Sequence, residues 1–198
     1  MQTLALDRHG WLRPGLTRPE PSVQCLPSPN SDARPAGAAV SLLVIHNISL
    51  PPNRFEGPCV ADLFLNRLDY SSHPWLERLR GLRVSAHFFV RRNGSVLQFV
   101  STDDRAWHAG VSQFRGRERC NDFSIGIELE GADTVPYDDR QYHTLARLVP
   151  LLRGRYPLAH VRGHEHIAPG RKTDPGPAFD WQRFGHESGY ARRAMPSF

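Results

Sequence analysis

Lysine is almost absent from this sequence. Lys172 is the only lysine among 25 lysine and arginine residues, in a chain of 198 residues with a formal net charge of +5. A solvated basic surface draws on both residue types, so one interpretation is that Lys172 supplies a compact, movable ammonium that arginine cannot. The alternative is an arginine-rich composition that leaves few lysines. The mild basic excess suits an acidic ligand, either nucleic acid or a small molecule that carries carboxylates.

Cysteine and long apolar segments are also scarce. Cys25, Cys59 and Cys120 are too few and too scattered for a disulfide framework or a cysteine-rich zinc site, and their odd number indicates a reducing compartment. No segment approaches the roughly 18 consecutive apolar residues of a membrane span, and the N-terminus lacks the pattern of a signal peptide. We therefore expect a soluble, cytoplasmic protein without a membrane partner.

The length fits one domain with extended ends. Residues 1–39 are rich in Pro, Ser, Asn and Arg, which predicts an arm that is laid over the domain or partly disordered, with Trp11 and Leu12 available to pin it down. Residues 40–184 are expected to form the domain itself. Residues 185–198 are expected to form a loose C-terminal tail.

Hydrophobic patterning in residues 40–184 predicts strands interleaved with helices. Strands are expected at 40–48, 84–90, 96–100, 124–130 and 159–163, and helices at 59–70, 74–82, from 138 or 139 to just before 154, and at 179–184. Asn93-Gly94 between two β-rich runs predicts a hairpin, and Pro150 should kink the long helix or move its end. The predicted fold class is α/β, a single domain with a central mixed β-sheet flanked by helices.

The segment 163–176 concentrates functional groups, with two imidazoles, two carboxylates and two cations in fourteen residues. Its glycines and prolines predict an irregular loop rather than a helix or strand. Within it, His164 and Asp174 could aim a nitrogen and an oxygen at one ion. A mononuclear catalytic zinc site takes three protein ligands and one water, so a third ligand must lie elsewhere. His46 is the best candidate, because it ends a predicted strand and α/β sheets bind ligands at that edge.

Spacing leaves alternatives open for the metal ligands. His166, His160 and His87 could each replace one imidazole. A histidine at a strand end is more often a hydrogen-bonded core residue than a ligand, and an aspartate before a proline is often a turn residue. The metal site is therefore a hypothesis that depends on the three candidates occurring together.

Glu128 lies on an otherwise apolar strand, where a carboxylate is costly to bury unless it is paired or used. If it points toward a metal-activated water, it can act as the general base. Strand alternation puts Glu130 on the same face, so periodicity cannot rank the two. Lys172 could place its ammonium near the oxyanion of a tetrahedral intermediate, and a surface lysine is the alternative.

Five blocks of the sequence together resemble one known family. They are residues 44–52 (VIHNISLPP), 83–88 (RVSAHF), 105–112 (RAWHAGVS), 119–131 (RCNDFSIGIELEG), and the segment that runs from Gly163-His164 to the Lys172-Thr173-Asp174-Pro175-Gly176-Pro177 run. This combination closely resembles the AmpD-type 1,6-anhydro-N-acetylmuramyl-L-alanine amidases over about residues 11–181. Those are cytoplasmic zinc enzymes of peptidoglycan recycling, and their wider fold is similar to phage amidase-type lysozymes and peptidoglycan recognition proteins.

The resemblance implies a role for each candidate residue. It implies that His46, His164 and Asp174 bind one zinc ion and that Glu128 and Lys172 act in catalysis, which selects Glu128 over Glu130. It also implies four substrate-binding residues: Asn47, Arg83, Trp107 and Arg119. The two arginines would suit the carboxylates of a peptide, and the tryptophan an apolar or sugar face.

The implied reaction is zinc-dependent hydrolysis of the amide between the lactyl group of 1,6-anhydro-N-acetylmuramic acid and L-alanine. The substrate would be a small-molecule anhydro-muropeptide and the enzyme a monomer. The phage relatives usually carry a catalytic tyrosine just before the histidine that matches His87, and here Ala86 takes that place, which fits a branch in which a glutamate has the role. Two rival functions are a module that binds peptidoglycan fragments without cutting them and a nucleic-acid-binding protein. The complete ligand set disfavours the first, and the dispersed arginines disfavour the second.

Overall fold

A six-stranded sheet organises the structure, a computed structural model that describes residues 4–13 and 22–197. Its strands, in spatial order, are β12 (His160–Gly163), β5 (Leu42–Ile48), β11 (Ser124–Glu130), β6 (Phe88–Val90), β7 (Val96–Gln98) and β3 (Val23–Cys25). The first four are parallel, β7 is antiparallel to β6, and β3 is parallel to β7. The mixed sheet and the β6–β7 hairpin confirm the predicted α/β class.

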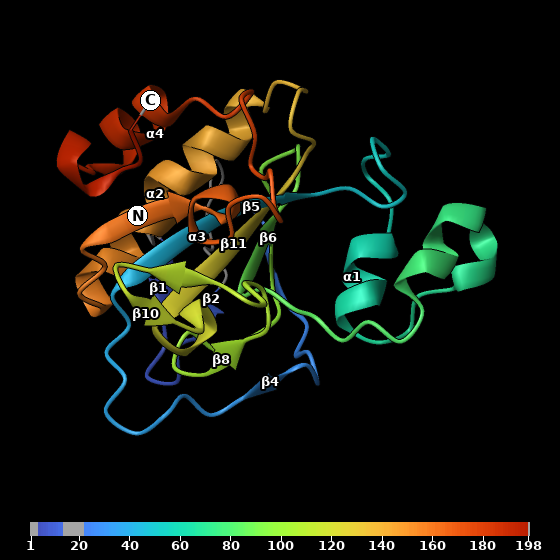
Figure 1. Cartoon of the computed structure of the whole chain (residues 1–198), viewed down its shortest axis with the longest axis horizontal. Coiled ribbons are helices and arrows are strands. Elements are labelled where there is room, and N and C mark those ends of the chain that lie inside the picture. The colour runs from blue at the N-terminus through green and yellow to red at the C-terminus, as the bar shows by residue number, and fades with distance from the viewer. Residues whose placement is uncertain (1–3, 14–21, 198) are drawn as a thin grey trace.

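The central strands present different residues to their two faces. Leu43 and Ile45 of β5 join the core cluster that contains Leu145 and Leu148 of helix α2 (Asp139–Arg155) and Phe184 of helix α4 (Trp181–Ser188). Figure 1 shows α2 and α4 together on one side of the sheet. Leu42 and Val44 belong to another cluster. His46 therefore follows Leu42 and Val44 on the face away from α2.

Helix α2 begins where the sequence predicts. The side chain of Asp138 caps it by accepting from Arg140 N, and the side chain of Gln141 accepts in return from Asp138 N, which completes a capping box. Pro150 lies inside the helix rather than at its end, and the helix continues through Gly154 to Arg155.

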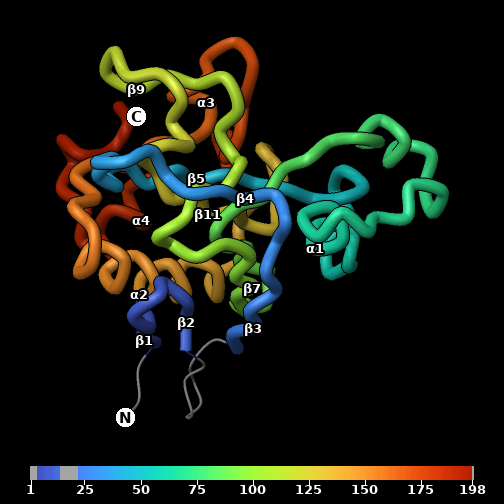
Figure 2. Tube along the Cα trace, turned by 90° about the horizontal axis from the view of Figure 1, so that it is seen from below, coloured from blue at the N-terminus to red at the C-terminus, as the bar shows by residue number. Residues whose placement is uncertain are grey.

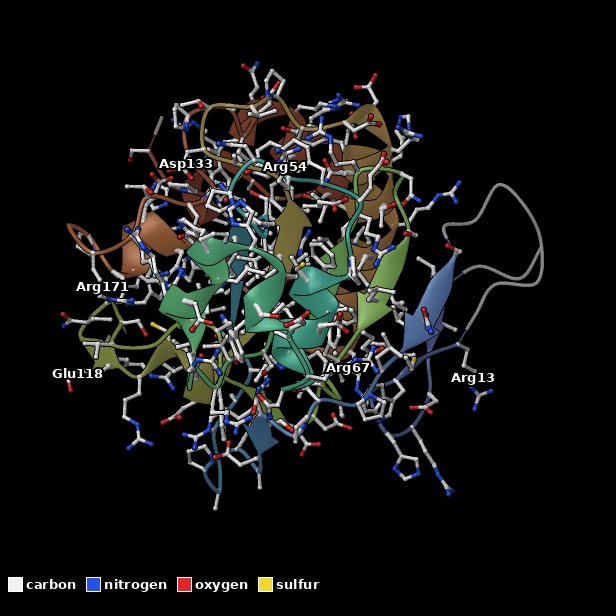
Figure 3. All side chains as sticks on the ribbon, turned by 90° about the vertical axis from the view of Figure 1, so that its right-hand side faces the viewer. Arg13, Arg54, Arg67, Glu118, Asp133 and Arg171 are labelled. Atoms are coloured by element: carbon white, nitrogen blue, oxygen red, sulfur yellow. The ribbon has the colours of Figure 1, made fainter. Side chains whose placement is uncertain are left out.

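The α1 lobe, residues 59–79, lies beside the sheet on the right of Figure 1 and faces the viewer in Figure 3. It contains α1 (Cys59–Phe64) and the 3₁₀ turns η1 (Tyr70–Ser72) and η2 (Pro74–Leu79). The helix expected over 59–70 is thus shorter than predicted, because Asn66 adopts a left-handed conformation with φ of 58° just after it. The second expected helix is a 3₁₀ turn. Both pack through apolar residues such as Phe64 and Leu76 against β6 and β7.

The described parts of the N-terminal segment include four short strands, which the arm expected there did not contain. Strands β1 (Ala5–Leu6) and β2 (Leu12–Arg13) make a hairpin below α2 in Figure 2, β3 adds to the main sheet, and β4 (Ser31–Asp32) pairs with β8 (Arg105–Ala106). Leu12 is buried, as expected. Residues 1–3 and 14–21 of the predicted arm lie outside the described residues. Strands β3 and β4 were not revealed by the local sequence because their partners lie far along the chain, and β1 and β2, with two residues each, are too short to show an alternation.

Two further expectations are corrected by the structure. The segment 163–176 begins with a one-turn helix, α3 (His164–Ile167), and is irregular only after it. Residues 185–197 are not loose, because α4 crosses the expected start of the tail, Tyr190 and Met195 are buried, and a 3₁₀ turn η4 (Arg192–Ala194) follows. Residue 198 lies outside the described residues.

The remaining elements are small. Strands β9 (Gln113–Phe114) and β10 (Arg117–Glu118) form a two-stranded hairpin, which leads into the 3₁₀ turn η3 (Cys120–Phe123) and then into β11. Within the described ranges, no helix combines the length and the apolar character that crossing a membrane requires.

Candidate metal centre

Three parallel strands bring the candidate residues to one edge of the sheet. His46 of β5 is in register with Glu128 of β11, and Gly163 at the end of β12 is in register with Ile45. His164 follows Gly163 directly and so arrives level with His46. The site therefore lies at the carboxyl ends of parallel strands, where α/β sheets place their ligands.

The side chains of His46, His164 and Asp174 converge on one point. His46 Nδ1 lies 3.0 Å from His164 Nδ1 and 3.1 Å from Asp174 Oδ2, and His164 Nδ1 lies 3.2 Å from the same oxygen. Around a tetrahedral zinc ion with bonds of about 2.0–2.1 Å, ligand atoms are about 3.3 Å apart. The three atoms thus form a triangle of nearly the size that such an ion needs. Among the described residues, this is the only such group of His, Cys, Asp or Glu side chains.

The far nitrogen of each histidine has its own acceptor. His164 Nε2 donates to the carbonyl of Ala109 at 3.0 Å. His46 Nε2 lies 2.9 Å from Nδ1 of His108, and either nitrogen can carry the shared proton. With the proton on Nε2, each ring directs the lone pair of Nδ1 at the shared point, which is the form that a metal ligand requires. Burial lowers the pKa of His46 to about 4, so its imidazole is neutral near pH 7.

Asp174 adds the negative charge of the group. Burial by itself would raise its pKa, but the contacts with His164 and His46 outweigh that effect and hold the pKa well below its usual value. Two imidazoles and one carboxylate are a donor set that fits a divalent ion such as zinc.

The other histidines considered from the sequence have different partners. His166 Nδ1 accepts from the backbone N–H of Gly163, and His87 Nδ1 accepts from that of Gly126. The ring of His160 packs beside Phe114, with 5.4 Å between ring centroids. The structure therefore brings together the three candidates preferred from the sequence and not these alternates.

Glu128 and Glu130 differ in their surroundings, although both are buried on one face of β11. Glu130 accepts hydrogen bonds from the backbone N–H groups of Glu56 and Arg92. Glu128 Oε2 is buried without a hydrogen-bond partner among the described residues. Burial raises the pKa of Glu128 well above its usual value, and nearby Asp174 raises it further. A buried carboxyl group left without partners is typical of a functional site.

A pocket of about 500 Å³ opens beside the donor group. Glu128, His164 and Asp174 lie in its wall together with Lys172, the only lysine of the chain. The α1 lobe contributes an apolar side that includes Phe64 and Trp75. The pocket therefore joins the candidate metal ligands to a surface able to hold a ligand with both polar and apolar parts.

The four substrate-binding residues expected from the sequence lie in different places. Asn47 and Trp107 line this pocket, and the Asn47 amide also donates to Asp133 Oδ1 at 2.8 Å and to the carbonyl of Pro175 at 3.1 Å. Arg83 is exposed outside the pocket lining. Arg119 lines a second pocket of about 590 Å³ together with Glu118 and Arg171, which lie on one side of the molecule in Figure 3.

His108 is the site residue that sequence reasoning missed. It is buried, its Nε2 lies 3.1 Å from Ser124 Oγ, and its Nδ1 lies 2.9 Å from Nε2 of His46, a candidate metal ligand. The RAWHAGVS block contained it, but only the adjacent tryptophan was singled out. Contact between that block and β5 depends on tertiary structure, so the spacing carried no signal for it.

An α/β sheet that carries a His-His-Asp group at its carboxyl edge, beside a buried free carboxyl group and an open pocket, is an arrangement that fits a metal-dependent hydrolase. The sequence profile of the N-acetylmuramoyl-L-alanine amidases matches residues 36–177. This chain belongs to the N-acetylmuramoyl-L-alanine amidase family.

Individual relatives agree with that assignment. The chain is 56% identical over 161 residues to the 1,6-anhydro-N-acetylmuramyl-L-alanine amidase AmpD of Escherichia coli strain K12. The aligned region covers 80% of this chain and 88% of that protein. A crystal structure of a selenomethionine AmpD derivative superposes with a TM-score of 0.86 at 52% identity, covering 92% of this chain and 98% of that one. The amidase AmiD of E. coli, in complex with anhydro-N-acetylmuramic acid-L-Ala-D-γ-Glu-L-Lys, gives a TM-score of 0.54 at 28% identity, covering 92% of this chain and 65% of that one.

More distant structures share the fold alone. The endolysin amidase LysCS of Clostridium intestinale gives a TM-score of 0.59, covering 85% of this chain and 97% of that one, and a human peptidoglycan recognition protein gives 0.56, covering 87% and 93%. Both are 15% identical to this chain. The expected fold similarity to endolysin-type amidases and peptidoglycan recognition proteins is confirmed.

Proposed function

We propose that this protein is a zinc-dependent amidase of anhydro-muropeptides. The bond cleaved is the amide between the lactyl group of 1,6-anhydro-N-acetylmuramic acid and the L-alanine of the attached peptide, a reaction of peptidoglycan recycling. The observation that carries the proposal is the triangle of His46 Nδ1, His164 Nδ1 and Asp174 Oδ2, with edges of 3.0–3.2 Å at the wall of a pocket. The name and high identity of the AmpD relative support the substrate class.

One zinc ion per chain is the proposed cofactor, held by His46, His164 and Asp174. Zinc in such a site lowers the pKa of a water molecule toward about 7 and polarises a carbonyl. The tautomers and the carboxylate described above are what this chain contributes to holding the ion.

Glu128 is proposed as the general base and acid. A carboxylate here would take the proton of the attacking water and then give it to the leaving amine nitrogen of L-alanine. Its position in the pocket wall and its unpartnered Oε2 support this role. Lys172 is proposed to donate its ammonium to the carbonyl oxygen as that oxygen becomes negative. Its place in the same wall supports this assignment.

The other parts of the proposal concern substrate contacts and cellular setting. Asn47, Arg83, Trp107 and Arg119 are proposed to contact the muropeptide, of which Asn47 and Trp107 are supported by their place in the pocket lining. We further propose a cytoplasmic monomer in which residues 40–184 carry the zinc amidase chemistry, flanked in sequence by an N-terminal arm (1–39) and a C-terminal segment (185–198).

The test combines metal content with product formation. We expect native mass spectrometry to find about one zinc per chain in the wild type and none in Asp174→Ala. A chromatographic assay on anhydromuramyl tripeptide should show free peptide released by the wild type alone. Wild-type protein that binds the muropeptide, contains no zinc and leaves the amide intact would instead establish the peptidoglycan-binding module.

A further inference from the structure

A two-residue segment, His108-Ala109, contacts both candidate metal histidines. His108 Nδ1 lies 2.9 Å from His46 Nε2, within hydrogen-bond distance, and the carbonyl of Ala109 accepts from His164 Nε2 at 3.0 Å. The two histidines, His46 on β5 and His164 on α3, are 118 residues apart in sequence. Their far nitrogens nevertheless meet acceptors on adjacent residues of one loop. Any shift of this loop would therefore change the orientation of both rings together.

The side chain of Asn121 fixes this segment. Its Oδ1 accepts from the backbone N–H of His108 at 3.1 Å and from that of Ala109 at 2.8 Å. One amide oxygen thus holds both residues that the ligands contact. Asn121 lies on η3, which leads directly into β11, so the segment is tied to the strand that carries Glu128.

The ring of His108 is also fixed from its other side. Its Nε2 lies 3.1 Å from Ser124 Oγ, which can accept a proton from Nε2 and so leave Nδ1 as the acceptor for His46. The ring lies directly over Gly126, where a Cβ atom would come within 2.5 Å of His108 Cγ. This close approach explains a glycine in the middle of an otherwise well-filled strand. The orientation of His108 is thus set by a hydrogen bond, by the backbone contact with Asn121, and by packing.

We infer that His108 and Asn121 are positioning residues that preset the two metal histidines for binding. They fix both rings with the proton on Nε2, so that both Nδ1 lone pairs are aimed at one point before the ion arrives. The inference rests on the metal site of the proposed function and goes beyond it by assigning metal affinity to residues that do not touch the ion. Outer partners of this kind typically change metal affinity by roughly 10- to 100-fold.

Two pairs of variants test the inference through zinc affinity, measured by competition with a chromogenic chelator. Asn121→Leu removes the acceptor for both backbone N–H groups, whereas Asn121→Asp keeps an oxygen in the same position. His108→Leu removes the acceptor for His46, whereas His108→Asn keeps an oxygen near the position of Nδ1. We expect each leucine variant to bind zinc roughly 10- to 100-fold more weakly than the wild type. Each conservative variant should recover most of that loss.

Asn30→Ala is the matched control, because Asn30 is a buried asparagine whose amide also holds backbone, with bonds to the carbonyls of Phe64 and Val84, but none to a metal histidine. It should lower the melting temperature and leave the zinc Kd unchanged. The visible spectrum of the Co²⁺-substituted protein gives a second readout, and we expect its bands to shift in both leucine variants and not in Asn30→Ala.

The outcomes separate this inference from the proposed function. A wild type that binds no zinc would refute the metal site itself. Folded leucine variants with wild-type zinc affinity would refute the positioning role and leave the metal site standing, as would a conservative variant that loses as much affinity as its leucine partner. If one leucine variant does not fold, the other pair decides the question by the same criterion.

Discussion

At the scale of single residues, the two buried glutamates of β11 differ in their hydrogen-bond partners. Glu130 is held by two backbone N–H groups, and Glu128 has an oxygen with no partner beside the pocket. We predict that Glu128→Gln lowers kcat by roughly 10²- to 10⁴-fold, because the amide cannot accept the proton, while the bound zinc is unchanged. The measurement is kcat on anhydromuramyl tripeptide together with metal content.

Glu130→Gln is the matched control for that prediction, since it keeps an oxygen that can accept one of the two backbone bonds. It should lower the melting temperature and keep kcat within a few-fold of the wild type. A Glu128→Gln enzyme that keeps more than about a tenth of wild-type kcat, well above the range expected for a lost general base, would assign the proton transfer to another group.

Lys172 is exposed, yet it lines the same pocket as Glu128 and Asp174. We predict that Lys172→Ala lowers kcat by roughly 100- to 1000-fold, as expected when one donor to a developing oxyanion is lost. Zinc content should stay at the wild-type level, because the side chain contributes no ligand atom. Lys172→Arg keeps the charge but not the compact ammonium, so an intermediate kcat is expected. Near-normal kcat in zinc-loaded Lys172→Ala would contradict the role.

At the scale of elements, helix α2 depends on its capping box. Gln141 also donates from Nε2 to the carbonyls of Val90 and Glu130, so the first turn of α2 is joined to β6 and β11. We predict that Asp138→Ala lowers the free energy of unfolding by about 1 kcal/mol and the melting temperature by about 2–4 °C. Asp138→Asn should retain most of the stability, because an asparagine also caps helices. Equal stability of the alanine variant and the wild type would show that the cap is dispensable.

The same cap gives a pH dependence. Hydrogen bonds from Arg140 lower the pKa of Asp138 in the folded protein. A carboxyl group with a depressed pKa stabilises the fold above its unfolded pKa, about 3.9, and loses that contribution as the pH falls below it. The difference in unfolding free energy between the wild type and Asp138→Ala should therefore shrink between pH 5 and pH 3 in urea titrations. Because Asp138 is largely solvated, the change should be a fraction of the cap energy.

The elements differ in how well the sequence predicts them. Strands β5 and β11 and helix α2 were found from their own patterns, because burial on one or both faces and a capping residue are local signals. The apolar spacing through Leu68 suggested a longer α1, but the helix ends before Asn66, and Leu68 is buried from the irregular segment that follows. Helix α3 was missed because one turn is too short to show a period. Strand β3 was missed because its partner β7 is about seventy residues away.

The sequence predicted the residues of the candidate site better than it predicted their hydrogen-bond partners. His46, His164 and Asp174 were indicated by their occurrence together at a strand end and in a glycine-rich loop. Glu128 was preferred over Glu130 only through the family resemblance. The N–H groups of Glu56 and Arg92 donate to Glu130 and not to Glu128. Only the tertiary structure brings these groups to β11, so the sequence could not show which glutamate lacks a partner. The acceptors behind the histidines were hidden for the same reason, since a backbone carbonyl such as that of Ala109 has no signature in the side-chain sequence.

At the scale of the whole molecule, the pocket lies between the carboxyl edge of the sheet and the α1 lobe. One wall comes from strand ends and the segment after α3, and the other from the α1 lobe with Leu63, Phe64 and Leu79. The lobe joins the rest through an apolar cluster that includes Phe89 and Phe99. Leu63 and Phe64 belong both to this cluster and to the pocket wall. We therefore expect substrate binding to be coupled to the position of the lobe.

The N-terminal segment is part of the same packing rather than an accessory. Arg34 reaches from it to the carbonyls of Thr102, Asn121, Asp122 and Ser124 at 2.9–3.3 Å, and burial lowers its pKa to about 10. We predict that Arg34→Met lowers the free energy of unfolding by about 3 kcal/mol, because buried carbonyls lose a charged donor. The loss is measured by urea denaturation. Arg80→Met, which removes an exposed arginine paired with Glu77, should cost less than about 1 kcal/mol. Equal costs for the two variants would mean that residues 22–39 only lie on the surface, and that the loop carrying Asn121 is held without them.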